Sequence, residues 1–253
     1  MRLEEKTLEP YLGWNIIYNL ARWIGVGLGA WYFYRALYQT PPIRKPHLAL
    51  FILVGSLVAL FGGSVLPYFY KKLTLEFPVS FMNAGRYVHS TFAFTLLYVI
   101  LASRKLGWPT RKIMDIYAIA GMLMSGIGRI GCHFQGCCMG KPTTLPWAID
   151  FHKYPWVPVH PAQLYMLGAE LGLFGFLWWF NKRKQYDGQT FWLSIWLYAI
   201  YRFLIEIVRT NPPVVAGLTH AQLFSVFGGI FSTIVLLYYR LHPPTTPSDL
   251  NRR

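Results

Sequence analysis

Seven long apolar stretches constrain this chain more than any other feature of its sequence. A bilayer core about 30 Å thick requires roughly 20 predominantly apolar residues per helix. Stretches of that length lie at 14–34, 47–69, 79–102, 112–131, 161–180, 190–208 and 220–239. None alternates with the period of two that a membrane β-barrel requires. We therefore expect an all-α polytopic membrane protein with seven transmembrane helices, forming a single integral membrane domain over residues 1–253.

The composition excludes the soluble and the disordered classes of protein. Hydrophobic residues make up 54% of the chain and charged residues only 13%, whereas soluble domains carry about 25% charged residues. Intrinsic disorder requires low hydrophobicity. The net charge of +14 is compatible with nucleic-acid binding, but the basic residues lie between the apolar stretches, which favours a membrane surface. We expect no nucleic-acid partner.

The distribution of Lys and Arg among the connecting segments predicts the orientation. The N-terminal segment and the even-numbered loops carry 7 of them, whereas the odd-numbered loops and the C-terminal tail carry 13. Because loops rich in Lys and Arg stay in the cytoplasm, the N-terminus is predicted outside and the C-terminus in the cytoplasm.

Several ionisable residues lie inside the apolar stretches, where each charge costs at least about 2.5–3.5 kcal/mol at the centre of the bilayer. With the predicted orientation nearly all of them fall in the outer half of the membrane. They are Arg22, Arg86, His89, Arg129, Glu170, Arg202 and Glu206, and Arg209 follows directly after the sixth stretch on the same helix face as Arg202 and Glu206. Guanidinium groups outnumber carboxylates here and bind phosphate in bidentate fashion, so a phospholipid headgroup from the outer leaflet is the predicted counter-ion. A purely structural alternative is an i, i+4 pair between Arg202 and Glu206, with Arg22 extending to the interface.

Residues 126–140 read GIGRIGCHFQGCCMG. The Gly-x-Gly-x-x-Gly spacing follows no predicted strand, which argues against a dinucleotide site; these glycines permit close helix approach or turn backbone amides toward a phosphate. Cys132, His133, Cys137 and Cys138 are of the types that zinc prefers. Four ligands within seven residues rarely complete a tetrahedron, so a disulfide using Cys132 or simple packing of the cysteines is favoured, and we expect no metal or cofactor.

Three separated segments, in order along the chain, resemble the prolipoprotein diacylglyceryl transferases of the bacterial inner membrane. The resemblance runs from about residue 80 to 235, with Asp115 and Gln222 also in register. It rests on Gly128-Arg129-Ile130-Gly131 with Gly136 and Gly140 (signature motif), on His160-Pro161-Ala162-Gln163-Leu164-Tyr165, and on Tyr201-Arg202-Phe203 with Glu206 and Arg209.

The resemblance implies a multi-pass enzyme of the bacterial inner membrane, working as a monomer among membrane lipids. Such an enzyme transfers the diacylglyceryl group of phosphatidylglycerol to the lipobox cysteine of a preprolipoprotein signal peptide and releases glycerol 1-phosphate. By the same resemblance Arg129 and Arg202 hold the lipid phosphate and His89 accepts the proton of the substrate thiol. The substrate-binding residues that it implies are Gly128, Arg129, Gly131, Gln163, Tyr165, Arg202, Glu206 and Arg209.

The chain departs from the family pattern around the acceptor. Cys132-His133 stand where the family usually has Asn-Phe, and Cys137 stands where it usually has Glu. Ser90-Thr91 replace a Gly-Gly pair, and Met166 replaces a second Glu. Two alternatives therefore stay open. One is a paralogue that uses the same lipid donor with a different acceptor. The other is a non-catalytic lipid-binding or thiol- or metal-responsive membrane protein.

The orientation can be tested directly. A cytoplasm-active reporter fused after Arg253 should be active in cells, and a periplasm-active reporter at the same place should be silent. The opposite pair of signals would show that the C-terminus lies outside the cytoplasm and that the predicted orientation is wrong.

Overall fold

The computed structural model describes residues 5–41, 43, 45–74, 88–151 and 157–242. At 5–14, 45–46, 70, 74 and 88–89 it describes the backbone alone. Residues 79–87 of the third predicted stretch, including Arg86, lie outside the described residues. So does the side chain of His89, whose backbone belongs to a helix.

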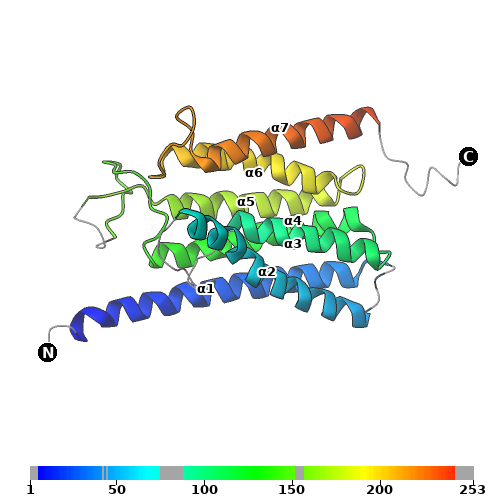
Figure 1. The fold of residues 1–253 in the computed structure, drawn as a ribbon, viewed down its shortest axis with the longest axis horizontal. Helices are drawn as coiled ribbons and strands as arrows, with labels where there is room; N and C mark the ends of the chain where they lie inside the picture. The colour runs from blue at the N-terminus through cyan, green and yellow to red at the C-terminus, as the bar shows by residue number, and fades with distance from the viewer. Residues whose placement is uncertain (1–4, 42, 44, 75–87, 152–156, 243–253) are drawn as a thin grey trace, which may run out of the picture. The chain divides into compact units, whose positions relative to one another are not determined.

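Within the described residues the chain forms seven helices and no β-strand (Figure 1). The all-α prediction is therefore confirmed for this part of the chain. Four helices, α2, α4, α6 and α7, are long and apolar enough to cross a membrane, so seven spans remain a prediction. The helices are α1 (Glu5–Tyr38), α2 (Lys45–Thr74), α3 (Val88–Lys105), α4 (Thr110–Phe134), α5 (Ala162–Asn181), α6 (Gln189–Ile207) and α7 (His220–Leu241).

The chain divides into two compact units. One unit comprises 30–116, and the other comprises 1–29 together with 117–253. The candidate functional residues at Arg129 and beyond all belong to the second unit.

In the unit 30–116, α2 and α3 approach closely at a glycine. A Cβ built at Gly62 would lie 2.6 Å from Cβ of Phe94, so no larger residue fits there without a shift. The hydroxyl of Ser90 donates a hydrogen bond to the carbonyl oxygen of Gly62, and Tyr98 donates one to the carbonyl of Phe51 at 2.8 Å. These side-chain bonds to the backbone join the two helices where water is excluded.

In the other unit, α1 packs on α4 through a Gly-x-x-x-Gly pair. Cβ atoms built at Gly25 and Gly29 would lie 2.8 Å from the carbonyl oxygen of Met124 and 3.2 Å from that of Ala120. Farther along α4, a Cβ at Gly131 would lie 2.8 Å from the carbonyl oxygen of Tyr18. Small residues let two backbones approach in this way and thereby increase the van der Waals contact between helices.

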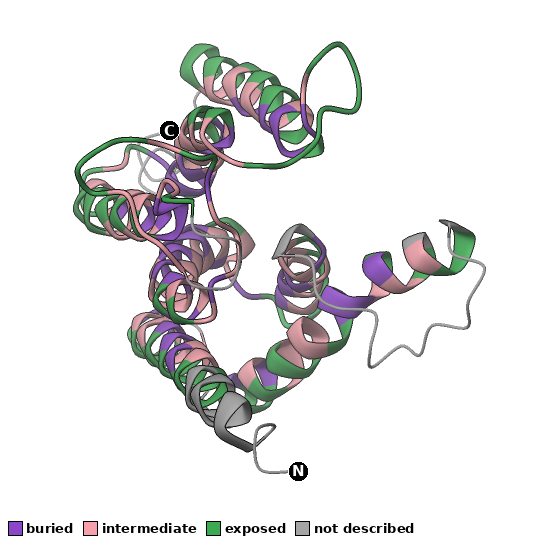
Figure 2. Cartoon of the chain, turned by 90° about the vertical axis from the view of Figure 1, so that its left-hand side faces the viewer, coloured by how far each residue is buried: buried purple, intermediate pink, exposed green. Residues whose placement is uncertain are grey.

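Figure 2 shows buried and exposed residues alternating along the helices, and on α7 the buried side is made of small and polar residues. On α7 the buried residues are Ala221, Gln222, Ser225 and Ser232. Phe224 and Phe227 on the same helix are 64% and 70% exposed. A water-soluble protein rarely exposes such a continuous apolar face, so this face fits contact with lipid.

The packing of α1 on α4 generates a test with an internal control. Gly25→Leu should lower the free energy of unfolding by about 1–3 kcal/mol or more, because the new side chain meets the backbone of α4. Gly27→Leu makes the same chemical change on α1, where nothing lies within 4 Å of the new Cβ, and should be near neutral. Thermal unfolding of the two purified variants in detergent measures the difference; equal midpoints would contradict this packing.

Candidate functional site

The first element of the site is a buried ion pair between α4 and α5. Arg129 donates from Nη2 to Oε1 of Glu170 at 2.8 Å, and its Nε lies 3.2 and 3.3 Å from the two carboxylate oxygens. Glu170 is completely buried and Arg129 is 9% exposed. The hydroxyl of Tyr201, on α6, donates to Oε1 of Glu170. One carboxylate thus connects three helices and fixes the plane of the Arg129 guanidinium group.

A glycine allows this pair to form. Gly126 precedes Arg129 by about one helical turn, and a Cβ there would lie 3.0 Å from Cδ2 of Leu171 and 3.4 Å from Cβ of Glu170. Because α4 carries no side chain at this point, α5 comes close enough for the two charged groups to meet.

The second element is a carboxylate shared by two arginines near the end of α6. Arg202 donates from Nη1 to Oε2 of Glu206 at 2.5 Å. Nε of Arg209 lies 3.9 Å from the same oxygen, and the amide of Asn211 donates to Oε1. Arg202 and Glu206 are both buried. The pair is therefore part of a network and not an isolated surface contact of the kind that contributes little.

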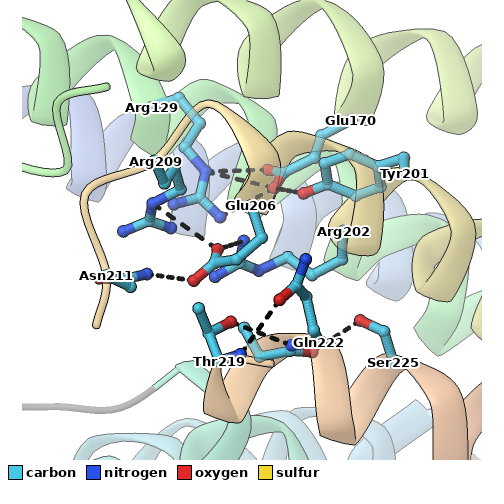
Figure 3. Close-up of polar contacts among 11 residues, drawn as sticks. Arg129, Glu170, Tyr201, Arg202, Glu206, Arg209, Asn211, Thr219, Gln222 and Ser225 are labelled. Carbon is cyan, nitrogen blue, oxygen red and sulfur yellow. Dashed lines mark hydrogen bonds and ion pairs between the residues drawn. The ribbon is translucent and has the colours of Figure 1, made fainter. Parts of the chain in front are cut away.

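These two elements lie side by side in Figure 3, together with the start of α7. There Thr219 and Gln222 form a capping box: Thr219 Oγ1 accepts from the amide of Gln222 at 3.3 Å, and Gln222 Oε1 accepts from the amide of Thr219 at 3.0 Å. Such reciprocal bonds satisfy two otherwise free donors at a helix start. Gln222, which the sequence placed in register with the family, thus fixes where α7 begins.

The segment after α4 is tied by its backbone to the start of α5 and the end of α6. The amide of Gly140 donates to the carbonyl of His160 at 3.0 Å, and the amide of Lys141 donates to the carbonyl of Val208 at 2.7 Å. A Cβ at Gly140 would lie 2.5 Å from Cβ of His160, so this contact requires glycine. The connection holds the signature segment next to Arg209.

The side chains of the 160–165 segment support the same loop. Gln163 is completely buried and donates from Nε2 to the carbonyl oxygen of Cys137 at 2.6 Å. Its Oε1 has no hydrogen-bond partner among the described residues. The hydroxyl of Tyr165 accepts from Nε1 of Trp147 at 2.6 Å and lies 3.4 Å from Nδ1 of His160.

The cysteines meet because of the way α4 ends. Gly136 has φ +63°, its amide donates to the carbonyl of His133 at 3.1 Å, and the amide of Cys137 donates to that of Cys132 at 3.2 Å. This pair of bonds is the Schellman motif, which brings the side chains at its two ends together. The sulfur atoms of Cys132, Cys137 and Cys138 all lie within 4.8 Å of one another.

The loop thiol of Cys138 lies in a distinctive electrostatic environment. Hydrogen bonds from the thiols of Cys132 and Cys137, with the Arg209 and Arg129 guanidinium groups nearby, hold the pKa of Cys138 well below its usual range. His133, in contrast, lies against the rings of Phe134 and Phe151 and is not among the residues that meet around the three sulfurs.

The structure thus brings together four of the predicted substrate-binding residues, namely Arg129, Arg202, Glu206 and Arg209 (Figure 3). Gly131 lies against Tyr18 of α1, and a Cβ at Gly128 would meet nothing within 4 Å. Arg22 lies over the ring of Tyr18, with 5.2 Å from Cζ to the centroid.

Sequence reasoning did not assign three residues of the network to the site: Glu170, Tyr201 and Asn211. Glu170 carried the clearest signal, because a carboxylate in mid-membrane requires a cationic partner and Arg129 lay at a compatible depth. Tyr201 belonged to a segment that carries the family resemblance but was given no role, and nothing in the sequence pattern distinguishes Asn211 from other polar residues near helix ends.

Comparison with known proteins decides the family. The family model of the prolipoprotein diacylglyceryl transferases matches residues 14–239. The chain belongs to this family. A phosphatidylglycerol–prolipoprotein diacylglyceryl transferase of Clostridium tetani (strain Massachusetts / E88) is 30% identical over 199 residues, covering 74% of this chain and 80% of that protein.

Two further relatives carry the same name. The protein of Bordetella avium (strain 197N) is 36% identical over 146 residues, covering 56% of this chain and 54% of its own length. That of Shewanella sp. (strain ANA-3) is 27% identical over 248 residues, covering 92% of this chain and 87% of its own length. The family match thus extends over all seven described helices, and it includes the buried arginines.

The buried pair between α4 and α5 generates a stability prediction. Glu170→Gln should lower the free energy of unfolding by about 3–5 kcal/mol, because it leaves the Arg129 charge buried without its counter-ion. Asp187→Asn removes one charge of an ion pair with Lys184 in which the Asp187 side chain is 48% exposed, and should cost no more than about 1 kcal/mol. Thermal unfolding of the two variants in detergent measures the difference. Similar losses of unfolding free energy in both would mean that the Arg129–Glu170 pair is not desolvated.

Proposed function

We propose that this protein transfers the diacylglyceryl group of phosphatidylglycerol to the lipobox cysteine thiol of preprolipoproteins and releases glycerol 1-phosphate. Membership of the family and the names of the relatives support this activity. The proposal includes seven membrane spans, an outside N-terminus, a cytoplasmic C-terminus, a location in the bacterial inner membrane and a monomeric enzyme.

One observation carries the proposal: a buried cluster with more positive than negative charge. Arg129, Arg202 and Arg209 contribute three guanidinium groups, and Glu170 and Glu206 contribute two carboxylates. One positive charge is therefore left at a place where an uncompensated charge is expensive. A phosphodiester, which carries one negative charge, is the ligand that balances it.

The arginines are held so that part of each guanidinium group is free. Arg129 uses Nε and Nη2 for Glu170, and Arg202 uses Nη1 for Glu206. Within the described part of the chain, Nη1 of Arg129 and Nη2 of Arg202 make no hydrogen bond. The carboxylates thus orient the arginines without using all of their donors, and a phosphate accepts the remaining ones.

The charge on the leaving group gives these arginines a catalytic role. In the transfer the acceptor sulfur forms a bond to the glyceryl carbon of the lipid, and the bond from that carbon to the phosphate oxygen breaks. The electron pair leaves with the oxygen, so a phosphodiester with one negative charge becomes a phosphomonoester with two. Oriented guanidinium groups bind the second form more strongly, and only such a difference accelerates a reaction.

Two further roles complete the proposal. His89 accepts the proton of the acceptor thiol, because an imidazole titrates near neutral pH. Gly128, Gly131, Gln163 and Tyr165 contribute to substrate binding at the outer side of the membrane. Gln163, whose buried Oε1 has no hydrogen-bond partner in the described part of the chain, has an acceptor available for a substrate donor.

The decisive experiment uses purified protein, phosphatidylglycerol vesicles and a lipobox peptide. Arg202→Ala should lower the release of glycerol 1-phosphate by about 100-fold or more, the usual effect of removing one preorganised donor from a developing anion. Arg183→Ala is the matched control, because Arg183 lies over the Trp179 ring just after α5 ends, apart from the cluster. Equal release by Arg202→Ala and the unchanged protein would overturn the proposal.

The same assay separates the alternative acceptor. The departures from the family pattern at Cys132, Cys137 and Met166 favour this alternative as the second candidate, because they leave the arginines unchanged. Release of glycerol 1-phosphate with a peptide of unchanged mass, together with the diacylglyceryl group found on another thiol, amine or hydroxyl compound added to the assay, would identify a paralogue that uses the same lipid donor.

A further inference from the structure

The three cysteines form a second cluster, which follows Arg129 along the chain and precedes Arg202. Their sulfur atoms all lie within 4.8 Å of one another. Zinc bound by thiolates at about 2.3 Å in a tetrahedron spaces the sulfurs about 3.8 Å apart. The three sulfurs are therefore already close to the separation that one such ion requires.

The backbone conformation that holds the three cysteines close together is unfavourable in free energy. Cys138 has φ +59°, a left-handed conformation that disfavours residues other than glycine by about 1–3 kcal/mol. The Schellman motif at Gly136 fixes Cys137 next to Cys132, and Gln163 donates to the carbonyl of Cys137 from a completely buried position. Strain retained at a cysteine, together with a buried amide that holds its neighbour, is typical of a preformed site.

The charge of the surroundings suits a metal–thiolate group. Three thiolates and one Zn²⁺ carry a net charge of −1. Arg209 and Arg129 are within electrostatic range of Cys138, and Arg129 is within range of Cys132. These two arginines attract the negative metal group before a lipid is bound, and the metal group and the lipid phosphate then share the excess positive charge of the arginine cluster.

We propose that Cys132, Cys137 and Cys138 bind Zn²⁺ through three thiolates and leave its fourth position open for the thiol of the acceptor. Three protein ligands with one open position are the usual arrangement of a catalytic zinc site. The proposal rests on the function proposed above, because it assigns the metal to the acceptor of that same reaction.

The step balances without any redox change. The acceptor thiol gives its proton to His89, the base of the function proposed above, as it binds the metal, and becomes a zinc-bound thiolate. Its sulfur forms the bond to the glyceryl carbon, and the electron pair of the broken carbon–oxygen bond leaves on glycerol 1-phosphate. Zinc stays Zn²⁺ throughout, and the thioether product is a weaker ligand that dissociates.

The first test measures the metal without measuring activity. Full-length protein purified in detergent under reducing conditions should contain about one zinc per chain by mass spectrometry of the metal. Cys137→Ser and Cys138→Ser should each lower this to below about a tenth, whereas Thr144→Ser, in the same loop, should retain it. The proposal would be overturned if the unchanged protein contained less than about a tenth of a zinc per chain, or if the cysteine variants contained as much zinc as the unchanged protein. A disulfide between two of the cysteines would also overturn it.

The second test needs no variant and so avoids any failure to fold. Zinc is removed from the unchanged protein with a chelator and replaced by Co²⁺, whose visible absorption reports tetrahedral thiolate ligation. A lipobox peptide should change this spectrum, and the same peptide with serine for cysteine should not. If the Co²⁺ absorption spectrum does not change when the cysteine peptide is added, an open fourth position on the metal is excluded.

A third test distinguishes the proposed metal site from the proposed function. Arg202→Ala should retain its zinc and lose the release of glycerol 1-phosphate. Stoichiometric zinc in a protein that never releases glycerol 1-phosphate would support the metal site and contradict the proposed function. Normal transfer by zinc-free protein would support the proposed function and contradict the metal site.

Discussion

Compensation of buried charge is the constraint on which this structure depends. An arginine inside a membrane helix is tolerated only where an anion meets it, and each arginine of the pairs on α4 and α6 has a carboxylate within hydrogen-bond distance. Glu170 also accepts from Tyr201, so its charge connects α4, α5 and α6. The positions of these helices relative to one another are thus set by electrostatics as well as by van der Waals packing.

Close helix packing makes this compensation possible. Gly126 allows α5 to approach α4 where Glu170 meets Arg129, and Gly25 and Gly29 allow α1 to approach the opposite part of the same helix. Lipid offers no hydrophobic driving force between helices, so these contacts and the buried ion pairs provide much of the specificity. Under the proposed function the same arrangement orients the arginines before the lipid binds.

Much of the fold and part of the site followed from the sequence. The seven apolar stretches predicted the helices, because length and hydropathy are local properties. The i, i+4 spacing likewise predicted the pair between Arg202 and Glu206. The partnership of Arg129 with Glu170 required knowledge of which helices are neighbours, and the meeting of the cysteines depended on a left-handed turn at Gly136 and Cys138. Neither can be read from periodicity alone.

The carboxylate of Glu206 has a consequence for how the segment between α6 and α7 can change during evolution. Asn211, four residues beyond the end of α6, donates to this carboxylate from outside the helix. An insertion between Ile207 and Asn211 would withdraw the amide and leave Oε1 of Glu206 without this hydrogen-bond donor. Added length is tolerated more easily between Asn211 and Thr219, so new loops in related chains should begin there.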